Sequence, residues 1–443
     1  MLTRICLSLA LIMATPAWSQ AIPIEEDQMQ TPPIVSGEAY PTSVGSEMRS
    51  NYLGVGFIFN TAYNDNVLGV ASTTPIRDFT YSILPTVTLD KTTPRQHLAL
   101  TYSPGFTFYQ HTSALNATDQ TAKLNFQYRL SEHTTILLSD SFQKSSSVFN
   151  QSYSLSGEAI SGSAQSPSTG VVVPYADQLN NTANAVFTYQ FARNGMIGVG
   201  GVATENKYSN PIEASGLYNS NSFGDSAFYS QRLSSTQYIG VTYQYLNSQG
   251  SPVNAQADPV NAQTGVQTHT LLPFYTIYLN PTLSLSLSCG PQYFYAVQSA
   301  LPAFRSWSPS STASIGWQKS HTNFVASYSR TITGGVGLPG AFDASSANTS
   351  ARWQIARTWI VGFGASYSIN KNVTPLFALS SPGGHTVAGI ASVQHSIGER
   401  LKAELGYTRL HQSYSGITII SDIPDSNREY ISVSYQLTRP LGR

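Results

Sequence analysis

Hydrophobic and polar residues alternate one by one along most of this chain. In residues 283–290, for example, Leu and Cys side chains occupy every second position, and Ser and Gly stand between them. A period of two is that of an extended strand with two different faces. Helical periodicity is absent. The same alternation is clear in segments 123–130, 359–368, 401–408 and 431–437.

The pattern predicts about eighteen strands, and sixteen are possible. Most are 10 to 15 residues long, whereas globular strands average about five or six residues and a tilted membrane strand needs roughly 9 to 11. Strand length therefore favours a membrane protein. The predicted strands lie near residues 52–63, 77–90, 95–109, 120–130, 134–143, 180–191, 195–206, 221–231, 236–246, 267–279, 283–295, 309–318, 322–332, 348–356, 358–369, 386–396, 400–410 and 428–438.

The connections between these strands are alternately short and long. Short ones include Lys91–Pro94 and Ser131–His133, and long ones include Lys144–Leu179 and Asn247–Val266. Outer-membrane barrels have short periplasmic turns and longer external loops. Lipid offers no hydrogen-bond partner, so a spanning sheet has to close on itself. We therefore predict an all-β fold, a closed antiparallel up-and-down transmembrane β-barrel. The alternative, a secreted β-solenoid, would have shorter and more uniform repeats.

The two ends of the chain differ from the strand series. Residues 1–21 resemble a secretory signal peptide, with Arg4 before an apolar run and small residues at the cleavage site. Residues 22–50 are rich in proline and acidic residues and predict a disordered periplasmic tether. We expect the barrel to span residues 51–438, with residues 439–443 as an overhang. This organisation places the protein in the outer membrane of a Gram-negative bacterium.

Composition excludes several classes of protein. Only 10% of the 443 residues are charged, whereas soluble domains draw about a quarter of theirs from charged types. The 23 basic and 23 acidic residues balance, so no basic stripe predicts nucleic-acid binding. After the signal segment, no apolar run reaches the roughly 18 residues of a membrane helix. A cytosolic globule, a nucleic-acid-binding protein and a helical membrane protein are all disfavoured.

The lumen is the candidate site. Eighteen strands enclose enough space for an aqueous channel, and the predicted inward faces carry mostly Ser, Thr, Gly, Asn and Gln. Such a near-neutral lining suits small polar solutes. The alternative is that these residues only hydrate the lumen, and that Lys402 and Glu404 pair with each other. The charged side chains expected to line the lumen are Lys123, Arg129, Arg352, Lys402 and Glu404.

Catalytic and metal-binding patterns are missing from the sequence. The eight histidines are scattered and no G-x-S-x-G motif occurs, so we expect no enzyme activity, cofactor or metal site. Asp65 lies between Asn64 and Asn66 and offers oxygen ligands, but such residues usually only end a strand. Cys289 is the one cysteine outside the signal segment, and the alternation places it on the lipid face.

Two features complicate the strand pattern. Proline removes a ladder donor, so we predict β-bulges at the five prolines inside strands. The longest connection, Lys144–Leu179, either folds inward as a neutral constriction or forms a mobile surface flap. The five prolines are Pro85, Pro104, Pro273, Pro291 and Pro309.

The first predicted strand carries a recognisable motif. Residues 54–67 are rich in glycine and aromatic residues and end in Tyr63, Asn64, Asp65 and Asn66. This segment resembles the opening strand of a family of outer-membrane β-barrel porins of Gram-negative bacteria, in which the strand ends in Tyr-Asp-Asp-Asn. Here Asn64 stands at the first Asp. The resemblance implies an outer-membrane barrel, and some relatives are associated with exopolysaccharide secretion.

Three functions remain open at this stage. We favour a passive porin, then an accessory barrel for polysaccharide export, then a structural or adhesive barrel with a sealed lumen. The expected partners are outer-membrane lipid, the barrel-assembly machinery, and small polar solutes or a polysaccharide. The last strand ends on Leu437 followed by a polar overhang, without the terminal aromatic residue of common assembly signals.

Overall fold

The computed structural model describes residues 51–68, 75–147, 175–210, 214, 216–254, 263–298, 302–334, 337–374, 383–415 and 423–441. Eighteen antiparallel strands form one closed sheet, as predicted. They are β1 (Tyr52–Asn64), β2 (Asp78–Thr92), β3 (Gln96–Tyr109), β4 (Ala117–Arg129), β5 (Thr134–Ser147), β6 (Tyr175–Ala192), β7 (Gly195–Tyr208), β8 (Tyr218–Ser234), β9 (Gln237–Pro252), β10 (Thr264–Asn280), β11 (Leu283–Gln298), β12 (Phe304–Lys319), β13 (Thr322–Gly334), β14 (Ala341–Ala356), β15 (Trp359–Asn372), β16 (Gly383–Ile397), β17 (Leu401–Ser415) and β18 (Ile423–Pro440).

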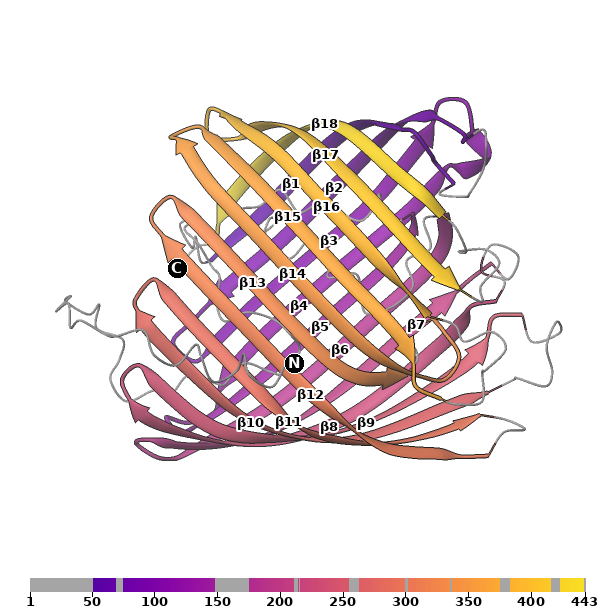
Figure 1. Cartoon of the computed structure of the whole chain (residues 1–443). Helices are drawn as coiled ribbons and strands as arrows, with labels where there is room; N and C mark the ends of the chain where they lie inside the picture. The colour runs from indigo at the N-terminus through magenta and orange to yellow at the C-terminus, as the bar shows by residue number, and fades with distance from the viewer. Residues whose placement is uncertain are drawn as a thin grey trace.

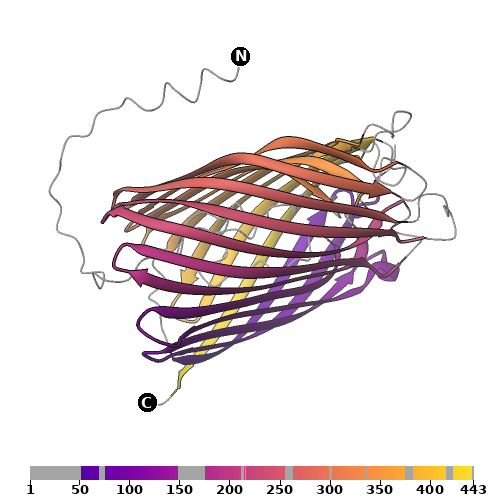
Figure 2. The same ribbon diagram turned by 90° about the horizontal axis from the view of Figure 1, so that it is seen from below.

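Each strand pairs with the next one in the chain, and the first pairs with the last. The β1–β18 ladder runs along all of β1, from Tyr52 opposite Pro440 to Asn64 opposite Arg428. Figure 1 shows the tilted strands side by side around the barrel, and Figure 2 shows short turns joining strands at one end, opposite the end of the longer sequence connections. We call these the turn end and the loop end. A closed sheet has no edge strand, which is the arrangement that lipid requires.

The outer face of the barrel is apolar. On β1, the large side chains Val55, Phe57 and Phe59 are exposed on the outside, and they alternate with Gly56 and Ile58. Directly opposed residues of an antiparallel pair share a face, so apolar rows continue from strand to strand. Near the turn end the exposed residues include three tryptophans. In the described part of the chain, no helix is long and apolar enough to cross a membrane.

The inner face is rich in hydroxyl groups, and many of them bond to each other across strands. Each such bond satisfies two polar groups inside the wall, which explains why Ser and Thr recur at inward positions. The pairs are Ser82–Thr107 (2.9 Å), Thr86–Ser103 (3.1 Å), Ser222–Ser248 (2.8 Å), Thr276–Ser286 (2.9 Å), Ser288–Thr312 (2.5 Å) and Ser329–Ser346 (2.7 Å).

The predicted bulges at the in-strand prolines are wrong. The register of β2 with β3 is the same on both sides of Pro85, which in this register lies opposite Pro104. Pro291 and Pro309 are likewise opposed, and Pro273 lies opposite Val241 without a shift. Proline has no backbone N–H to donate to the neighbouring strand. Where two prolines lie opposite each other, both missing hydrogen bonds fall at the same place between the two strands, and the rest of the pairing is unaffected. At the first such place, the Ser103 hydroxyl donates to the Pro85 carbonyl oxygen at 3.1 Å.

Several boundaries also differ from expectation. The last strand continues to Pro440, whereas the sequence places the end of the barrel at residue 438, because Arg439 and Pro440 still pair with β1. Cys289 is exposed and shares the outer face with Leu285 and Leu287. The expected signal peptide and tether, and most of the long 144–179 connection, lie outside the described residues.

Candidate functional site

The loop end of the lumen is narrowed by the tip of the β13–β14 hairpin. The pairing of β13 with β12 stops at Arg330, opposite Ser311. Beyond that point β13 continues to Gly334 and pairs only with β14, from Ala344 to Ala341. We call residues 331–334 and 337–344 the inward tip, because this part of the hairpin leaves the wall and lies against the inner face of other strands.

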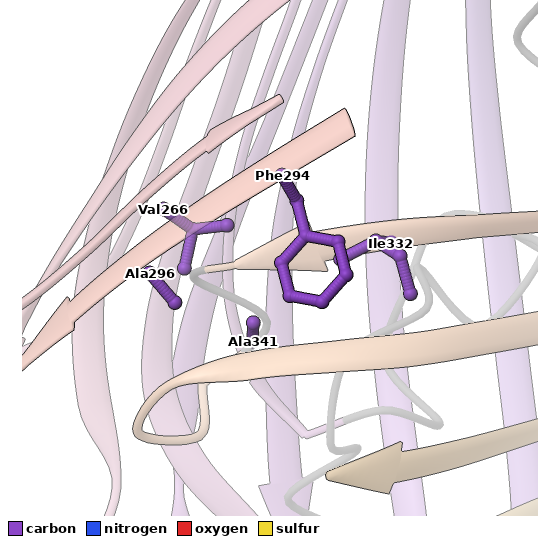
Figure 3. Packing of buried hydrophobic residues seen from close by; sticks show 5 residues of the cluster. All are labelled: Val266, Phe294, Ala296, Ile332 and Ala341. Atoms are coloured by element: carbon purple, nitrogen blue, oxygen red, sulfur yellow. The ribbon is translucent and has the colours of Figure 1, made fainter. Parts of the chain in front are cut away.

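Contacts of the inward tip reach strands that are not its neighbours in the sheet. Ile332 and Ala341 pack with Val266, Phe294 and Ala296, which belong to the inner faces of β10 and β11 (Figure 3). All five are at most 4% exposed. The tip therefore passes over β12 and forms a small apolar core inside the barrel, which anchors it by burying surface that would otherwise line water.

A single glutamine fastens the inward tip. Gln292 lies on the inner face of β11, with its Nε2 donating to the carbonyl oxygen of Ile332 at 3.0 Å. Its Oε1 accepts from the backbone N–H of Ile332 at 2.7 Å and from the hydroxyl of Thr331 at 3.2 Å. The side chain is 1% exposed. The backbone groups of Ile332 have no partner on β12, because β13 has separated from β12 at this point. Gln292 supplies the hydrogen bonds that they would otherwise lack.

Glycines allow the tip to approach the wall closely. A Cβ at Gly334 would lie 2.7 Å from the Cβ of Val266, so no larger residue fits there. Gly337 and Gly340 have φ values of 82° and 98°, which favour glycine. The carbonyl oxygen of Gly337 accepts from the N–H of Tyr218 at 3.1 Å. The tip consequently extends across the inner face as far as the start of β8.

An ion pair supports the base of the hairpin. The guanidinium of Arg330 donates from Nε to Oδ1 of Asp343 at 3.1 Å and from Nη2 to Oδ2 at 2.6 Å. This two-point geometry is the strongest that Arg and a carboxylate can form. It joins β13 and β14 just where β13 parts from β12, and so it holds the hairpin together as it bends inward.

The motif in residues 63–66 closes the seam between the first and last strands. The two carboxylate oxygens of Asp65 accept from the backbone N–H and the side-chain amide of Asn427, at 2.7 and 2.6 Å. The carbonyl oxygen of Asn66 accepts from Ser426 at 3.1 Å. Tyr63 packs on Phe79, and Asn64 is buried. The motif therefore has a structural role, because its hydrogen bonds to Ser426 and Asn427 join the end of β1 to β18.

We expect Asp65→Ala to lower the free energy of unfolding by about 2 kcal/mol, because it removes two hydrogen bonds to a carboxylate. Urea unfolding in detergent, followed by tryptophan fluorescence, measures the change. Asn427→Ala should cost a similar amount, and the double variant little more than either single one. The control is Glu132→Ala, an exposed carboxylate in the turn after β4. Fully additive losses from Asp65 and Asn427 would contradict a shared contact.

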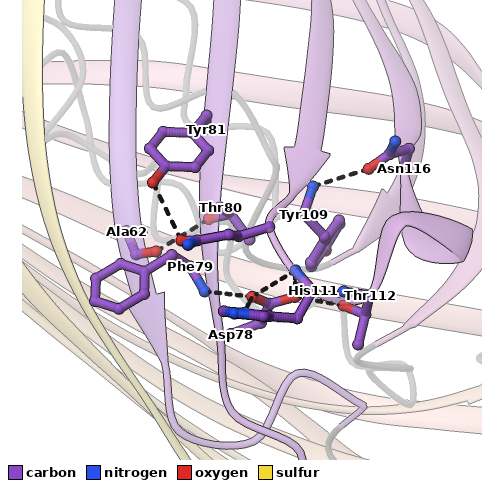
Figure 4. A network of polar contacts seen from close by, with 10 residues as sticks. Ala62, Asp78, Phe79, Thr80, Tyr81, Tyr109, His111, Thr112 and Asn116 are labelled. Atoms are coloured by element: carbon purple, nitrogen blue, oxygen red, sulfur yellow. Dashed lines mark hydrogen bonds and ion pairs between the residues drawn. The ribbon is translucent and has the colours of Figure 1, made fainter.

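A second carboxylate organises the loop end next to the seam. Asp78, whose side chain is fully buried, accepts from the backbone N–H groups of His111 and Thr112 at 3.0 and 2.8 Å. It also accepts from the Thr112 hydroxyl at 2.7 Å and lies 3.0 Å from Nδ1 of His111 (Figure 4). These bonds fix the β3–β4 connection on β2, so this part of the rim is braced by side chains.

The charged residues predicted to line the lumen fall on the inner faces of three strands. Lys123 and Arg129 lie on β4, on the face opposite to the exposed hydrophobic residues. Arg352 lies on β14, and Lys402 and Glu404 lie on β17. The structure therefore groups them into two separate regions. Their functional role stays a prediction.

Glu404 is held by neighbours on the inner wall. Its Oε1 accepts from the hydroxyl of Tyr430 at 2.8 Å. The ring of Tyr430 lies across Gly406, where a Cβ would collide with it, so the glycine is required for this contact. Lys402 lies two residues from Glu404 on the same face of β17. Arg352 lies three strands away on β14. The inner wall near the turn end therefore carries two positive groups and one acid.

Gln292 and Asn427 could not be identified from the sequence, since each acts through contacts that join distant parts of the chain. A usable signal does exist for the tip, because residues 331–341 contain no charged side chain and four glycines. No group of three or more His, Cys, Asp or Glu side chains among the described residues could hold a metal ion.

Comparisons with known proteins concern the fold. No family model matches the sequence, and no curated protein matches it. Among solved structures, the FrpB iron transporter from Neisseria meningitidis is 9% identical over 88% of this chain and 82% of that chain, with a TM-score of 0.43. OpdK from Pseudomonas aeruginosa is 10% identical over 87% and 99% of the two chains, with a TM-score of 0.38. The ferric citrate transporter FecA is 11% identical over 88% and 66%, with a TM-score of 0.45.

Proposed function

We propose that this chain is an outer-membrane channel that passes small, polar, near-neutral solutes by diffusion. The observation that carries the proposal is a closed barrel with an apolar outside and an inner face of paired hydroxyl groups. Such a lining presents hydrogen-bonding groups to water and few fixed charges. Delivery across the inner membrane by a cleaved signal peptide, and insertion by the barrel-assembly machinery, belong to the same proposal.

The inward tip defines where such a channel would discriminate by size. It covers the inner faces of β8 to β11 at the loop end, and its position is held by Gln292 and the apolar core. Within the described residues, the one charged side chain of the tip is Asp343, which is bonded to Arg330. A narrowing of this kind filters solutes by cross-section more than by charge, which suits neutral sugars and similar polar compounds.

Purified protein in a planar bilayer should give steady single-channel conductance, because the closed barrel has an inner face of hydroxyl groups that can be hydrated. Liposomes carrying it should swell in small neutral sugars and swell more slowly as the sugar grows. Heat-denatured protein at the same concentration is the control. Silence in both assays would contradict the channel and favour a sealed structural barrel. Conductance that a long polysaccharide blocks and small sugars leave unchanged would favour the export accessory.

A further inference from the structure

Two carboxylates interrupt the apolar outer wall of the barrel. Asp140 lies on β5 between Leu138 and Phe142, which are outward on the same strand. Asp225 lies on β8 between Phe223 and Ala227, also on the outer face. Charged groups facing the hydrocarbon of a bilayer are costly, and they are rare there unless they pair with something. Their position therefore requires an explanation.

Neither carboxylate has a partner within the described residues. Oδ1 of Asp140 is buried and accepts no hydrogen bond, and Asp225 forms no hydrogen bond or ion pair. Other polar groups on the outer face behave differently. Arg330 is bonded to Asp343, and the hydroxyl of Tyr243 lies 2.7 Å from Nδ1 of His269. The outer wall at Asp140 and Asp225 thus carries carboxylate oxygens that have no hydrogen-bond donor among the described residues.

Small residues leave a hollow in the outer wall beside Asp225. Ala185 on β6 and Gly201 on β7 lie in the same cross-strand row as Asp225, and Ala183 lies opposite Asp140. The hollow has a volume of about 480 Å³, and Asp225 is the one acid in its lining, whereas Asp140 lies outside it. The other lining residues are Ile136, Ala185, Val186, Phe187, Val199, Gly200, Gly201 and Ser226. We call this surface the acid-lined hollow. Its shape accepts a protruding side chain, and its chemistry selects one with a hydrogen-bond donor.

The matching shape lies on β9 and β10, the next two strands of the same barrel. Tyr243 and Tyr245 on β9 and His269 on β10 form a group of tilted rings, with the ring centroids of Tyr245 and His269 5.0 Å apart. We call these three residues the aromatic ridge. Tyr245 lies directly opposite Asp225 in register, so the ridge and the hollow share a depth in the wall. The phenol of Tyr245 has no hydrogen-bond partner among the described residues.

We propose that the acid-lined hollow receives the aromatic ridge of a second copy of this chain. The tyrosine hydroxyl donates to the Asp225 carboxylate, and both polar groups leave the hydrocarbon. The centres of the two surfaces are three of the eighteen strands apart, or about 60° around the barrel. Head-to-tail contacts between surfaces separated by this angle close a ring of three copies. Two hollows facing each other would instead oppose acid to acid.

Disulfide cross-linking in native membranes tests the geometry. In a Cys289→Ser background, Gly201→Cys places a thiol in the hollow, where a Cβ would meet nothing closer than 3.8 Å, and Tyr243→Cys places one on the ridge. The double variant should give trimers on a denaturing gel, and each single variant only monomers. Ala365→Cys with Val433→Cys, on the outer faces of β15 and β18, is the matched control pair and should give no cross-link. Self-linking of Gly201→Cys alone, or no link in the double variant, would overturn the proposal.

Replacing both acids tests whether the two carboxylates are needed for assembly or are only tolerated on the outer face. Native mass spectrometry in mild detergent should give three copies for the wild type and one for Asp140→Leu with Asp225→Leu. The barrel itself should stay folded, shown by its unchanged mobility shift on heating, because the variant removes two uncompensated carboxylates. An unchanged trimer in the variant, or a monomeric wild type, would refute the proposed interface.

Discussion

Removing the inward tip is expected to raise single-channel conductance by about twofold or more, because pore cross-section at the narrowest point limits ion flow. The variant replaces residues 333–342 with an Asn-Gly turn, which joins β13 to β14 as a tight hairpin. The Arg330–Asp343 ion pair remains at its base. Planar-bilayer recording measures the conductance, and liposome swelling should show that larger neutral sugars now enter.

A point substitution tests the same element with less disturbance. Gln292→Leu keeps the size of the side chain but removes three hydrogen bonds to the tip. We expect frequent fluctuations between the parent conductance and a higher level, since the apolar core alone then retains the tip. Gln394→Leu, at another buried inward glutamine far from the hairpin, is the control. If both the deletion and Gln292→Leu conduct like the parent, the narrowest point lies elsewhere in the lumen.

The strand series and its two faces could be predicted because they depend on local alternation. A residue such as Leu285 or Phe57 lies on the outer face for the same reason that its neighbours lie on the inner face, and the pattern repeats from strand to strand. The number of strands follows from counting hairpins. The in-strand prolines show the limit of this reasoning. Their effect depends on what lies opposite, and a ladder that opposes Pro291 to Pro309 keeps its register.

The inward position of the tip could not be predicted from the alternation, because residues 331–334 continue the pattern of β13 without a break. What bends the hairpin is Gln292, which lies 40 residues earlier and offers its amide to Ile332. The contacts at the seam between β1 and β18 were equally unpredictable, since Asp65 and Asn427 are 362 residues apart in the chain. Contacts that join distant strands across the lumen or the seam leave little local trace. The long 144–179 connection was the expected constriction, and its residues 148–174 are outside the described part of the chain.

Charge on the inner wall should set the ion preference of the channel. Arg352 and Lys402 lie on the inner faces of β14 and β17 near the turn end, with Glu404 held by Tyr430 beside them. We expect Arg352→Glu with Lys402→Glu to raise the permeability ratio of potassium to chloride about threefold or more, because rings and patches of fixed charge attract counter-ions into a pore. Reversal potentials in a potassium chloride gradient measure this ratio.

The matched control reverses two lysines that do not line the lumen. Lys91 lies at the end of β2 on the outer face and Lys319 at the end of β12, both exposed. Lys91→Glu with Lys319→Glu changes the net charge of the protein by the same amount, so it reports the effect of overall charge alone. High salt should reduce the shift in the lumen variant, since mobile ions screen fixed charges over about 3 Å at 1 M. Equal shifts in the two variants would show that ions do not pass the wall near Arg352 and Lys402, and that the conducting path, if present, follows the Lys123 side of the lumen.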